Sequence, residues 1–522
     1  MTLSDRGARV VLTAAWVLAI VLVHPSGEFP INDDWSYADT VRRLVEHGEW
    51  RLNAWTSMTL ATQVLWGWLF SQLMGFSFTT LRVSTLVLAW AATLGSYSLL
   101  RLSGAVPTMA CAGAVLVALC PVVFPLAFTF MTDVPALAFG VWALVCVLRY
   151  ANERRPADLA AAIVLLVATA LVRQTGIALA VGAMAALLVL PGPRREHTAA
   201  LACLVGPAAA LFAYGQFLRT TGTPSEFGSR EAQVLLMASD AHRLAGTILH
   251  SAAGTYFYLG LFVLPAVPLL ARTGRDRLAA AAAFACLAGS TAYVMKYGLL
   301  MPLFGNVLHD IGLSPILVAR ADLWPHAPAG IWMAVTIAAA LAAAAIVHQV
   351  VARGASVWDG PQRTPAILAG VSCVAYMAPL CVAGFIFDRY VGPALVLVLA
   401  FLTSLGSFRA VSRTAAGTSF ALIGALAAFD LAATRDLFSF NRARWQATNA
   451  VLQAGVPAED FQGGFEVTGA LRNTIIGAEY PRLLISLGDE PGYLRVSSYE
   501  FPRVIGSNPG ILYVLQRKAE PR

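Results

Sequence analysis

Long apolar segments constrain the fold of this chain more than any other feature. Stretches such as Ala329–Val351 and Ala415–Ala433 approach the ~20 residues that a helix needs to cross a bilayer. Of the 522 residues, 58% are hydrophobic and 12% are charged, whereas soluble domains carry roughly 25% charged residues. Backbone amides find no water inside a bilayer, so each stretch is expected to be a helix. The sequence therefore predicts an all-α polytopic membrane protein.

Thirteen segments are predicted to span the membrane. They are approximately 9–24, 81–101, 107–126, 134–150, 159–172, 176–191, 198–218, 251–271, 278–295, 329–351, 365–387, 391–406 and 415–433. The first segment follows two arginines and resembles a signal peptide. No small-residue cleavage site follows it, and His24-Pro25 ends the run, so it is expected to remain as the first span.

The arginines predict the orientation of the chain. If the N-terminus is cytoplasmic, fifteen arginines lie on short inside segments, and only Arg173 and Arg389 lie on short outside loops. Because positive residues accumulate on cytoplasmic loops, we expect this orientation, in the cytoplasmic membrane of a bacterium. The net charge of +7 is spread over helix ends and forms no single basic face, which argues against binding to nucleic acid.

Two regions outside the bundle carry more polar residues. The first outside loop, residues 24–80, contains two amphipathic stretches, Tyr37–His47 and Leu60–Leu73, which are expected to form helices on the membrane surface. Residues 434–522 hold 19 charged residues, against 46 in residues 1–433. A helix at Asn441–Ala454 and strands near 482–487, 493–499 and 511–516 are expected there. We therefore predict a membrane domain over residues 1–433 and a small extracytoplasmic α/β domain over residues 434–522.

Acidic residues gather where the first two outside loops meet the membrane. Asp33 and Asp34 follow the first span, and Asp133 lies in a very short loop between two later spans. Neighbouring carboxylates repel one another and raise a pKa, which suits a general base, so Asp33, Asp34 and Asp133 are the predicted catalytic residues. The alternative is that these residues cap the helices that follow them. A divalent metal shared by the three aspartates is also an open alternative.

Basic residues at the same edge run against the inside preference. Arg173 and Arg389 occupy outside loops, and Lys296 is expected at the outer end of the ninth span. An anionic headgroup would explain them, because arginine bonds two phosphate oxygens at once. For Arg389 the alternative is neutralisation by Asp388. A polyprenyl-phosphate sugar would account for acids and bases together, and Tyr37 and Tyr390 are further candidates for substrate contact.

These features resemble the GT-C glycosyltransferases. An acidic pair after the first span, a Tyr-Ala shortly after it, a second short loop with an acid, thirteen spans and a C-terminal outside domain are similar to the branch of protein O-mannosyltransferases and lipid A aminoarabinose transferases. Asp33-Asp34 and Tyr37-Ala38 occupy the corresponding places. The resemblance implies that Asp33 is the catalytic acid, and that no cofactor is required.

The chain also departs from that branch. The aminoarabinose transferases carry Lys-Pro-Pro on the second surface helix, whereas this chain has Leu60–Trp66 without a basic residue. Trp35 and Ser36 replace a basic residue that follows the acidic pair in the family. The residues that bind phosphate in the family therefore have no counterparts at these positions of the chain. The resemblance does not imply that lipid A is the acceptor.

The predicted reaction is an inverting transfer from a polyprenyl-phosphate sugar to a lipid, glycan or protein acceptor on the outer face, with Asp33 as base. A transporter or flippase of lipid-linked saccharides is the alternative, although we find no inverted repeats. A non-catalytic assembly or sensor protein is a third hypothesis. The seven cysteines all lie in apolar runs, and no P-loop, zinc or dinucleotide motif is present.

Overall fold

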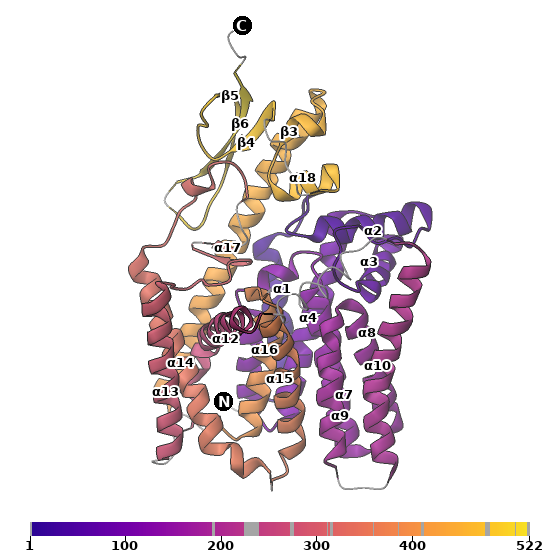
Figure 1. Ribbon diagram of the computed structural model, residues 1–522, viewed down its shortest axis with the longest axis vertical. Helices are drawn as coiled ribbons and strands as arrows, with labels where there is room; N and C mark the ends of the chain where they lie inside the picture. The colour runs from indigo at the N-terminus through magenta and orange to yellow at the C-terminus, as the bar shows by residue number, and fades with distance from the viewer. Residues whose placement is uncertain are drawn as a thin grey trace.

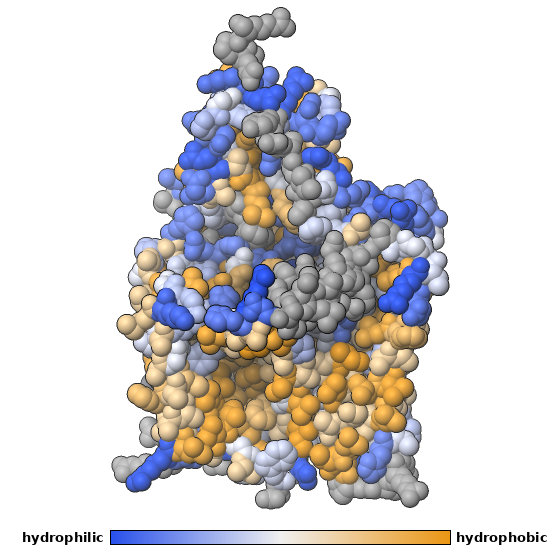
Figure 2. Space-filling view, viewed as in Figure 1, coloured by the Kyte–Doolittle hydropathy of each residue, from blue (hydrophilic) through white to orange (hydrophobic). Residues whose placement is uncertain are grey.

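The protein is a bundle of helices with a small sheet domain at one end. The computed structural model describes residues 3–190, 194–223, 240–271, 276–310, 312–313, 317–358, 360–384, 386–408, 412–474, 481–506 and 508–518. The N-terminus lies in the lower half of the bundle, and the C-terminus lies beyond the sheet domain at the top (Figure 1). Figure 2 shows hydrophobic residues across the visible face of the bundle, with hydrophilic residues at its lower edge and over the upper domain.

Each of the thirteen predicted spans contains a helix. The helices are α1 (Asp5–Val23), α4 (Phe78–Leu102), α5 (Pro107–Ala118), α7 (Asp133–Glu153), α8 (Pro156–Val172), α9 (Ile177–Leu188), α10 (Arg194–Thr220), α12 (Ala241–Val263), α13 (Arg277–Tyr297), α14 (Ala329–Arg353), α15 (Arg363–Ala383), α16 (Val391–Ser404) and α17 (Arg413–Gln453). Within the described residues, nine helical segments are long and apolar enough to cross a membrane. The polytopic helical fold is confirmed, and the number thirteen stays a prediction.

Short helical turns connect these elements. They are α6 (Phe124–Ala127), η1 (Gln174–Gly176), η2 (Leu264–Leu269), η3 (Ala321–Leu323), η4 (Gly354–Val357), η5 (Asp388–Tyr390) and η6 (Ala458–Asp460). Helix α1 begins where the Ser4 hydroxyl accepts the Gly7 N–H, 3.1 Å away. It ends at His24, whose φ of 60° closes the helix before Pro25, as the sequence predicts.

Two helices of the first loop lie across the upper end of the bundle (Figure 1). They are α2 (Asp34–His47) and α3 (Ala61–Met74), close to the two amphipathic stretches predicted from the sequence. Helix α2 buries its first two turns, from Asp34 to Val41. Helix α3 leaves Leu65, Leu69 and Leu73 exposed, which is the pattern of a helix that presents an apolar face to lipid.

Helix α17 runs continuously from the bundle into the sheet domain (Figure 1). The sequence suggested a span ending near Ala433 and a separate helix at Asn441–Ala454, whereas the structure joins them. No glycine or proline lies between the two stretches, so nothing in the sequence breaks the helix there. The change in composition at residue 434 therefore falls inside one element.

The upper domain is built on a four-stranded sheet. Its strand order is β3 (Phe461–Gln462), β4 (Leu483–Ser486), β6 (Gly510–Arg517) and β5 (Tyr493–Phe501). β3 and β4 are parallel and the other pairs are antiparallel. Helix α18 (Phe465–Arg472) follows β3. The three strands longer than two residues match the three predicted from the sequence.

The loop between α13 and α14 belongs partly to this domain. It contains the hairpin β1 (Leu308–His309) and β2 (Gly312–Leu313). Further along, Ala319 bridges to Ser486 of β4. The Trp324 ring stacks on Phe501 at a centroid distance of 6.2 Å. The domain core therefore includes residues from before the predicted boundary.

Candidate active site

A cavity of about 250 Å³ lies between the first loop and the sheet domain. It brings together residues from five separate parts of the chain. Its lining residues are Asn32, Asp33, Tyr37, Trp55, Ser57, Met58, Asn306, Leu317, Phe387, Arg389, Phe465 and Glu466. Of the residues predicted from the sequence, the structure places Asp33, Tyr37 and Arg389 in this lining.

Asp33 directs its carboxylate away from the helix that follows it. It occupies the residue before α2, but its side chain makes no capping hydrogen bond. One carboxylate oxygen accepts the Trp55 Nε1–H at 3.0 Å, and the other lies 3.5 Å from Arg389 Nη2. The side chain is 18% exposed. The capping alternative for Asp33 is therefore not what the structure shows, and the carboxylate is accessible from the cavity.

Asp34 is fully buried and does not share the contacts of Asp33. Its two oxygens accept the Ile31 N–H at 2.7 Å and the Phe130 N–H at 3.2 Å. Burial raises the pKa of Asp34 to about 7, against the opposing effects of Arg82 and the two amides. Asp34 therefore ties the first loop to the segment before α7, and it does not line the cavity.

Arg82 was not predicted from the sequence as a site residue, although its side chain binds the first loop. It is buried near the start of α4. Its guanidinium donates to the carbonyl oxygens of Pro25, Gly27 and Phe29, with the bond to Gly27 at 2.6 Å. An arginine at the outer end of a predicted span opposes the positive-inside trend, and this signal could have identified it.

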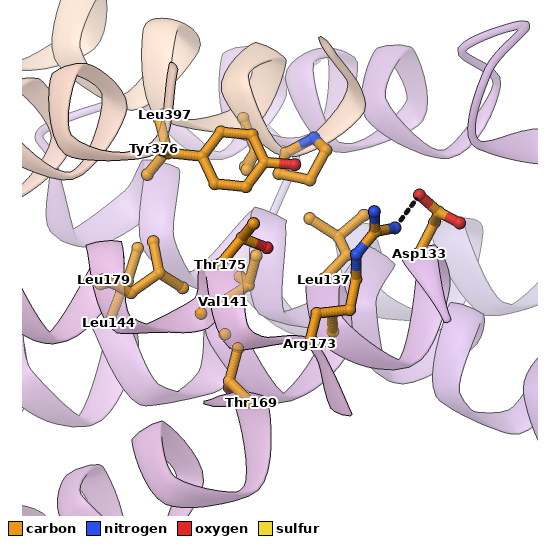
Figure 3. A pocket seen from close by; sticks show the side chains of 15 residues that line it. Asp133, Leu137, Val141, Leu144, Thr169, Arg173, Thr175, Leu179, Tyr376 and Leu397 are labelled. Atoms are coloured by element: carbon orange, nitrogen blue, oxygen red, sulfur yellow. Dashed lines mark hydrogen bonds and ion pairs between the residues drawn. The ribbon is translucent and has the colours of Figure 1, made fainter. Parts of the chain in front are cut away.

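Asp133 and Arg173 form a buried ion pair in an apolar surrounding (Figure 3). Asp133 is the first residue of α7, and Arg173 follows α8. The Arg173 guanidinium also lies over the Tyr390 ring, 4.7 Å from its centroid. The adjoining cavity, of about 30 Å³, is lined largely by aliphatic side chains. The pair is one structural unit, next to the larger cavity and not part of its lining.

Arg389 is the basic residue of the larger cavity. It is 4% exposed, and its Nε and Nη1 have no hydrogen-bond partner among the described residues. Its neighbour Asp388 does not neutralise it, because the Asp388 carboxylate accepts the backbone N–H groups of Val307 and Leu308 at 2.7–3.0 Å. A buried guanidinium with unused donors is costly unless a ligand satisfies it.

The remaining predicted residues occupy different surroundings. Tyr37 is buried beside Asp33; burial, and then the charge of Asp33, raises its pKa, so the phenol stays protonated. Tyr390 is buried between two guanidinium groups, those of Arg173 and Arg389. Lys296 lies exposed in the last turn of α13, with Nζ 5.1 Å from the Tyr297 ring centroid. It does not line the cavity.

Several lining residues had no sequence signal. Trp55 donates to Asp33, and Asn306 lines the cavity and has a buried Oδ1 without a partner among the described residues. Phe465 and Glu466 come from α18, more than 400 positions after Asp33. Only the fold brings them together, so a single sequence could not have indicated them.

A second, more open cavity of about 570 Å³ adjoins the first at Phe387. It lies between α12 and the segments around 303–304 and 384–387. Its polar lining includes Arg243, His250 and Ser251. The Tyr293 hydroxyl lies 2.5 Å from His250 Nδ1. The two cavities therefore share a wall at Phe387.

The aspartates do not converge as metal ligands would. Asp34 is occupied by backbone amides and Asp133 by Arg173. Over the part of the chain that the structure describes, no three His, Cys, Asp or Glu side chains gather around a common point. That the reaction needs no cofactor stays a prediction.

Comparisons with known proteins agree with the resemblance seen in the sequence. Residues 64–214 match the family model described as dolichyl-phosphate-mannose-protein mannosyltransferase. No curated protein matches the chain. The match confirms a resemblance to the GT-C superfamily, in the O-mannosyltransferase branch.

Solved structures align with the chain at low identity. The oligosaccharyltransferase AglB from Archaeoglobus fulgidus, in complex with an inhibitory peptide and a dolichol-phosphate, aligns at 13% identity with a TM-score of 0.43, over 86% of this chain and 58% of its own. The chain thus covers less than two thirds of that protein. ArnT from Cupriavidus metallidurans aligns at 12% identity, over 98% of both chains in the apo state, with a TM-score of 0.40. The ArnT structure bound to undecaprenyl phosphate has a TM-score of 0.38, with 98% and 99% coverage.

Proposed function

We propose that this chain is a glycosyltransferase that moves a sugar from a polyprenyl-phosphate donor to an acceptor hydroxyl or amine. The observation that carries the proposal is the pairing of Asp33 with Arg389 in the lining of one cavity. A partly exposed carboxylate lies 3.5 Å from a buried guanidinium with unused donors. The family match over residues 64–214, to a model named for a dolichyl-phosphate-mannose donor, supports the same chemistry.

In the proposed reaction Asp33 accepts the proton of the acceptor. The acceptor oxygen or nitrogen forms a bond to the anomeric carbon while the bond from that carbon to the phosphate oxygen breaks. Polyprenyl phosphate leaves with the electron pair, so the configuration at the anomeric carbon inverts. Phosphate is a good leaving group, and preorganised donors that stabilise its charge are sufficient without a general acid.

Arg389 is the proposed contact for the leaving phosphate. Its Nε and Nη1 are free to donate, and its Nη2 lies 3.5 Å from Asp33. A phosphate oxygen would compete with the Asp33 carboxylate for this guanidinium. Donor binding would then release Asp33 toward the acceptor, which couples the arrival of the donor to the availability of the base.

The other two predicted phosphate ligands fit this role less well. Arg173 is already bonded to Asp133, and Lys296 lies outside the cavity. We propose that Arg173 and Asp133 brace Tyr390, on which the Arg389 guanidinium also rests at 5.5 Å from the ring centroid. The second cavity beyond Phe387 would give one of the two substrates its own access to the site.

We further propose that the reaction takes place on the outer face of the bacterial cytoplasmic membrane. The cavity lies at the end of the bundle that carries α2, α3 and the sheet domain. The arginine distribution assigns that end to the outside. An exported reporter such as alkaline phosphatase, fused after Lys518, should therefore be active, and a fusion active only in the cytoplasm would contradict the assignment.

The test of the reaction is Asp33→Asn in the full-length detergent-solubilised protein. The donors are a panel of polyprenyl-phosphate sugars that includes polyprenyl-phosphate-[³H]mannose. We expect the rate at which polyprenyl phosphate is released from the donor to fall by about 10²–10⁴-fold. Binding of polyprenyl monophosphate should persist, because the base does not hold the phosphate. Glu46→Gln, an exposed acid on the same helix α2, is the matched control and should retain activity. Wild-type turnover by Asp33→Asn, with a donor that the wild-type protein uses, would refute the proposal.

A further inference from the structure

Helix α18 of the sheet domain lies against the first loop at several points. The Phe465 ring contacts Trp55 at a centroid distance of 6.4 Å. At the other end, Asn53 Nδ2 donates to Asn473 Oδ1 at 3.1 Å. Between them, a Cβ on Gly469 would lie 2.4 Å from the Trp35 ring. The glycine therefore allows the close approach of α18 to α2, and the two elements pack as one unit.

Glu466 is the charged residue of this contact and is 3% exposed. Its Oε2 accepts a 2.8 Å hydrogen bond from Arg444 Nη1 of α17. Arg444 Nη2 in turn donates to Asn441 Oδ1 at 2.6 Å. Because Arg444 is itself buried and held by Asn441, the Glu466 carboxylate has a fixed orientation.

The second oxygen of Glu466 reaches the residue before Asp33. Glu466 Oε1 accepts the Asn32 N–H at 3.3 Å. Asn32 has a φ of 58°, in the left-handed region that asparagine tolerates better than most residues. The Asn32 side-chain oxygen accepts the Asp33 N–H at 2.9 Å. Glu466 thus binds the N–H of Asn32, and the backbone turn at Asn32 determines where the Asp33 side chain points.

We propose that Glu466 is a positioning residue for the transfer reaction. By accepting the Asn32 N–H, it fixes the turn that directs the Asp33 carboxylate into the cavity. The sheet domain then contributes to the reaction centre indirectly, because Glu466 positions Asp33 through the first loop. The inference rests on the proposed function, because it assigns Glu466 a role only through Asp33.

Two features distinguish this role from packing between domains. Glu466 lines the cavity together with Asn32 and Asp33, whereas the Asn53–Asn473 bond lies outside that lining. The domain also has its own core, formed by residues such as Phe440, Ile485 and Leu512. A polar interaction one residue from the base is not required to complete that core.

The first experiment compares Glu466→Ala with Asn473→Ala in the full-length protein. Each removes one hydrogen bond between α18 and the first loop, and Glu466→Ala also removes the ion-pair partner of the buried Arg444. Only Glu466 bonds next to Asp33. Small displacements of a reacting group can lower rates by about 100-fold, so we expect kcat of Glu466→Ala to fall roughly 10- to 100-fold. The KM for polyprenyl-phosphate-[³H]mannose should change less than about twofold, because uniform binding is retained.

Asn473→Ala should keep both constants close to those of the wild-type protein. Equal losses in the two variants would overturn the proposal, because they would show that the contact acts only as packing. If Glu466→Ala does not fold, Glu466→Gln replaces it. The glutamine amide has one oxygen to accept hydrogen bonds from both the Asn32 N–H and Arg444. We therefore expect kcat to fall again while the KM for the sugar donor stays the same. An unchanged kcat in Glu466→Gln would also overturn the proposal.

A double-mutant cycle separates this inference from the proposed function. If Glu466 acts through Asp33, Glu466→Ala should cost nothing further in an Asp33→Asn background. An additional loss of the same size there would show that Glu466 acts independently of Asp33, and would overturn the inference alone. Wild-type activity of the Asp33→Asn single variant would instead refute the proposed function, and the role of Glu466 with it.

Discussion

Two aspartate–arginine pairs lie at the same end of the bundle, and they differ in how closely the partners approach and in the space beside them. Asp133 and Arg173 are hydrogen-bonded to each other beside a cavity of about 30 Å³, and Asp133 Oδ2 and Arg173 Nε have no other partner among the described residues. Asp33 and Arg389 are 3.5 Å apart beside a cavity of about 250 Å³, with two guanidinium nitrogens unused. The residue types are the same, yet the first pair is directly bonded with little space beside it and the second is wider apart and faces a larger cavity; we call them the closed and the open pair.

We propose that this difference separates the pair that acts on a substrate from the pair that does not. The cavity of about 30 Å³ beside the closed pair leaves little room for a ligand. An open pair carries the desolvation cost of a buried charge without full compensation, and a ligand can supply the missing hydrogen bonds. We therefore propose a structural role for the Asp133–Arg173 pair and a chemical role for the Asp33–Arg389 pair.

The largest effect on folding is expected at the closed pair. Asp133→Asn leaves the Arg173 charge buried without its counter-ion, and breaking such a pair costs about 3–5 kcal/mol. Thermal unfolding in detergent should therefore shift clearly to lower temperature. Asp33→Asn also takes a counter-ion from the buried Arg389, but that counter-ion is 3.5 Å away and 18% exposed, so the shift in unfolding temperature should be smaller. Equal shifts in the two variants would remove the distinction between the pairs.

A double replacement sharpens the same contrast. Asp133→Leu with Arg173→Met substitutes apolar side chains of similar size, and such exchanges of buried pairs are often neutral or stabilising. We expect the double variant to recover most of the stability lost in Asp133→Asn, and to transfer sugar within about tenfold of the wild-type rate, far above the roughly 10²–10⁴-fold loss expected without the base. A stable but inactive double variant would return Asp133 to the catalytic role predicted from the sequence.

The next effect concerns donor affinity at the open pair. Arg389→Ala removes the free donors proposed to bind phosphate, and a lost charged hydrogen bond costs about 1.5–3 kcal/mol. The affinity for polyprenyl monophosphate, measured by equilibrium binding in detergent, should fall about tenfold to a hundredfold, at 1.4 kcal/mol per factor of ten. Arg42→Ala, an exposed arginine of α2 paired with Asp39, is the control. An unchanged affinity in Arg389→Ala would show that the phosphate binds elsewhere.

The smallest effect is expected at Lys296. The sequence placed it with Arg173 and Arg389, whereas the structure leaves it exposed and outside the cavity. An exposed charge at this distance is screened by solvent and salt. Lys296→Ala should therefore change donor affinity less than about twofold. A loss as large as that of Arg389→Ala would restore the prediction made from the sequence.

The helical fold was largely predictable because a segment that crosses the bilayer must be apolar, helical and about 20 residues long. Apolar length and the ends of apolar runs, such as His24-Pro25, located the helices of the bundle. The amphipathic stretches located α2 and α3 for the same reason. The continuity of α17 was not predicted, because a change in composition at residue 434 was read as a change of element, although the segment from Ala433 to Asn441 contains no helix-breaking residue.

The site was predictable only where a residue violated a trend. Asp33 and Arg389, which line the cavity, were predicted because charges at the outer edge oppose hydropathy or the arginine distribution, whereas the same argument also selected Arg173, which lies outside the lining. The same argument applies to Arg82 and was not used. Glu466 and Asn306 could not be predicted as site residues from the sequence. Nothing in their sequence surroundings distinguishes them, and only the fold brings them into the same cavity lining as Asp33.

The most direct test is an experimental density map of the full-length protein with bound polyprenyl monophosphate. The account predicts a phosphate within hydrogen-bonding distance, roughly 3 Å, of Arg389 Nε or Nη1, with the Asp33 carboxylate facing the remaining space of the cavity. The Asp133–Arg173 pair should be unchanged. A phosphate bound by Arg173 or Lys296, with Arg389 still facing Asp33, would contradict the central claim that the open pair is the reaction centre.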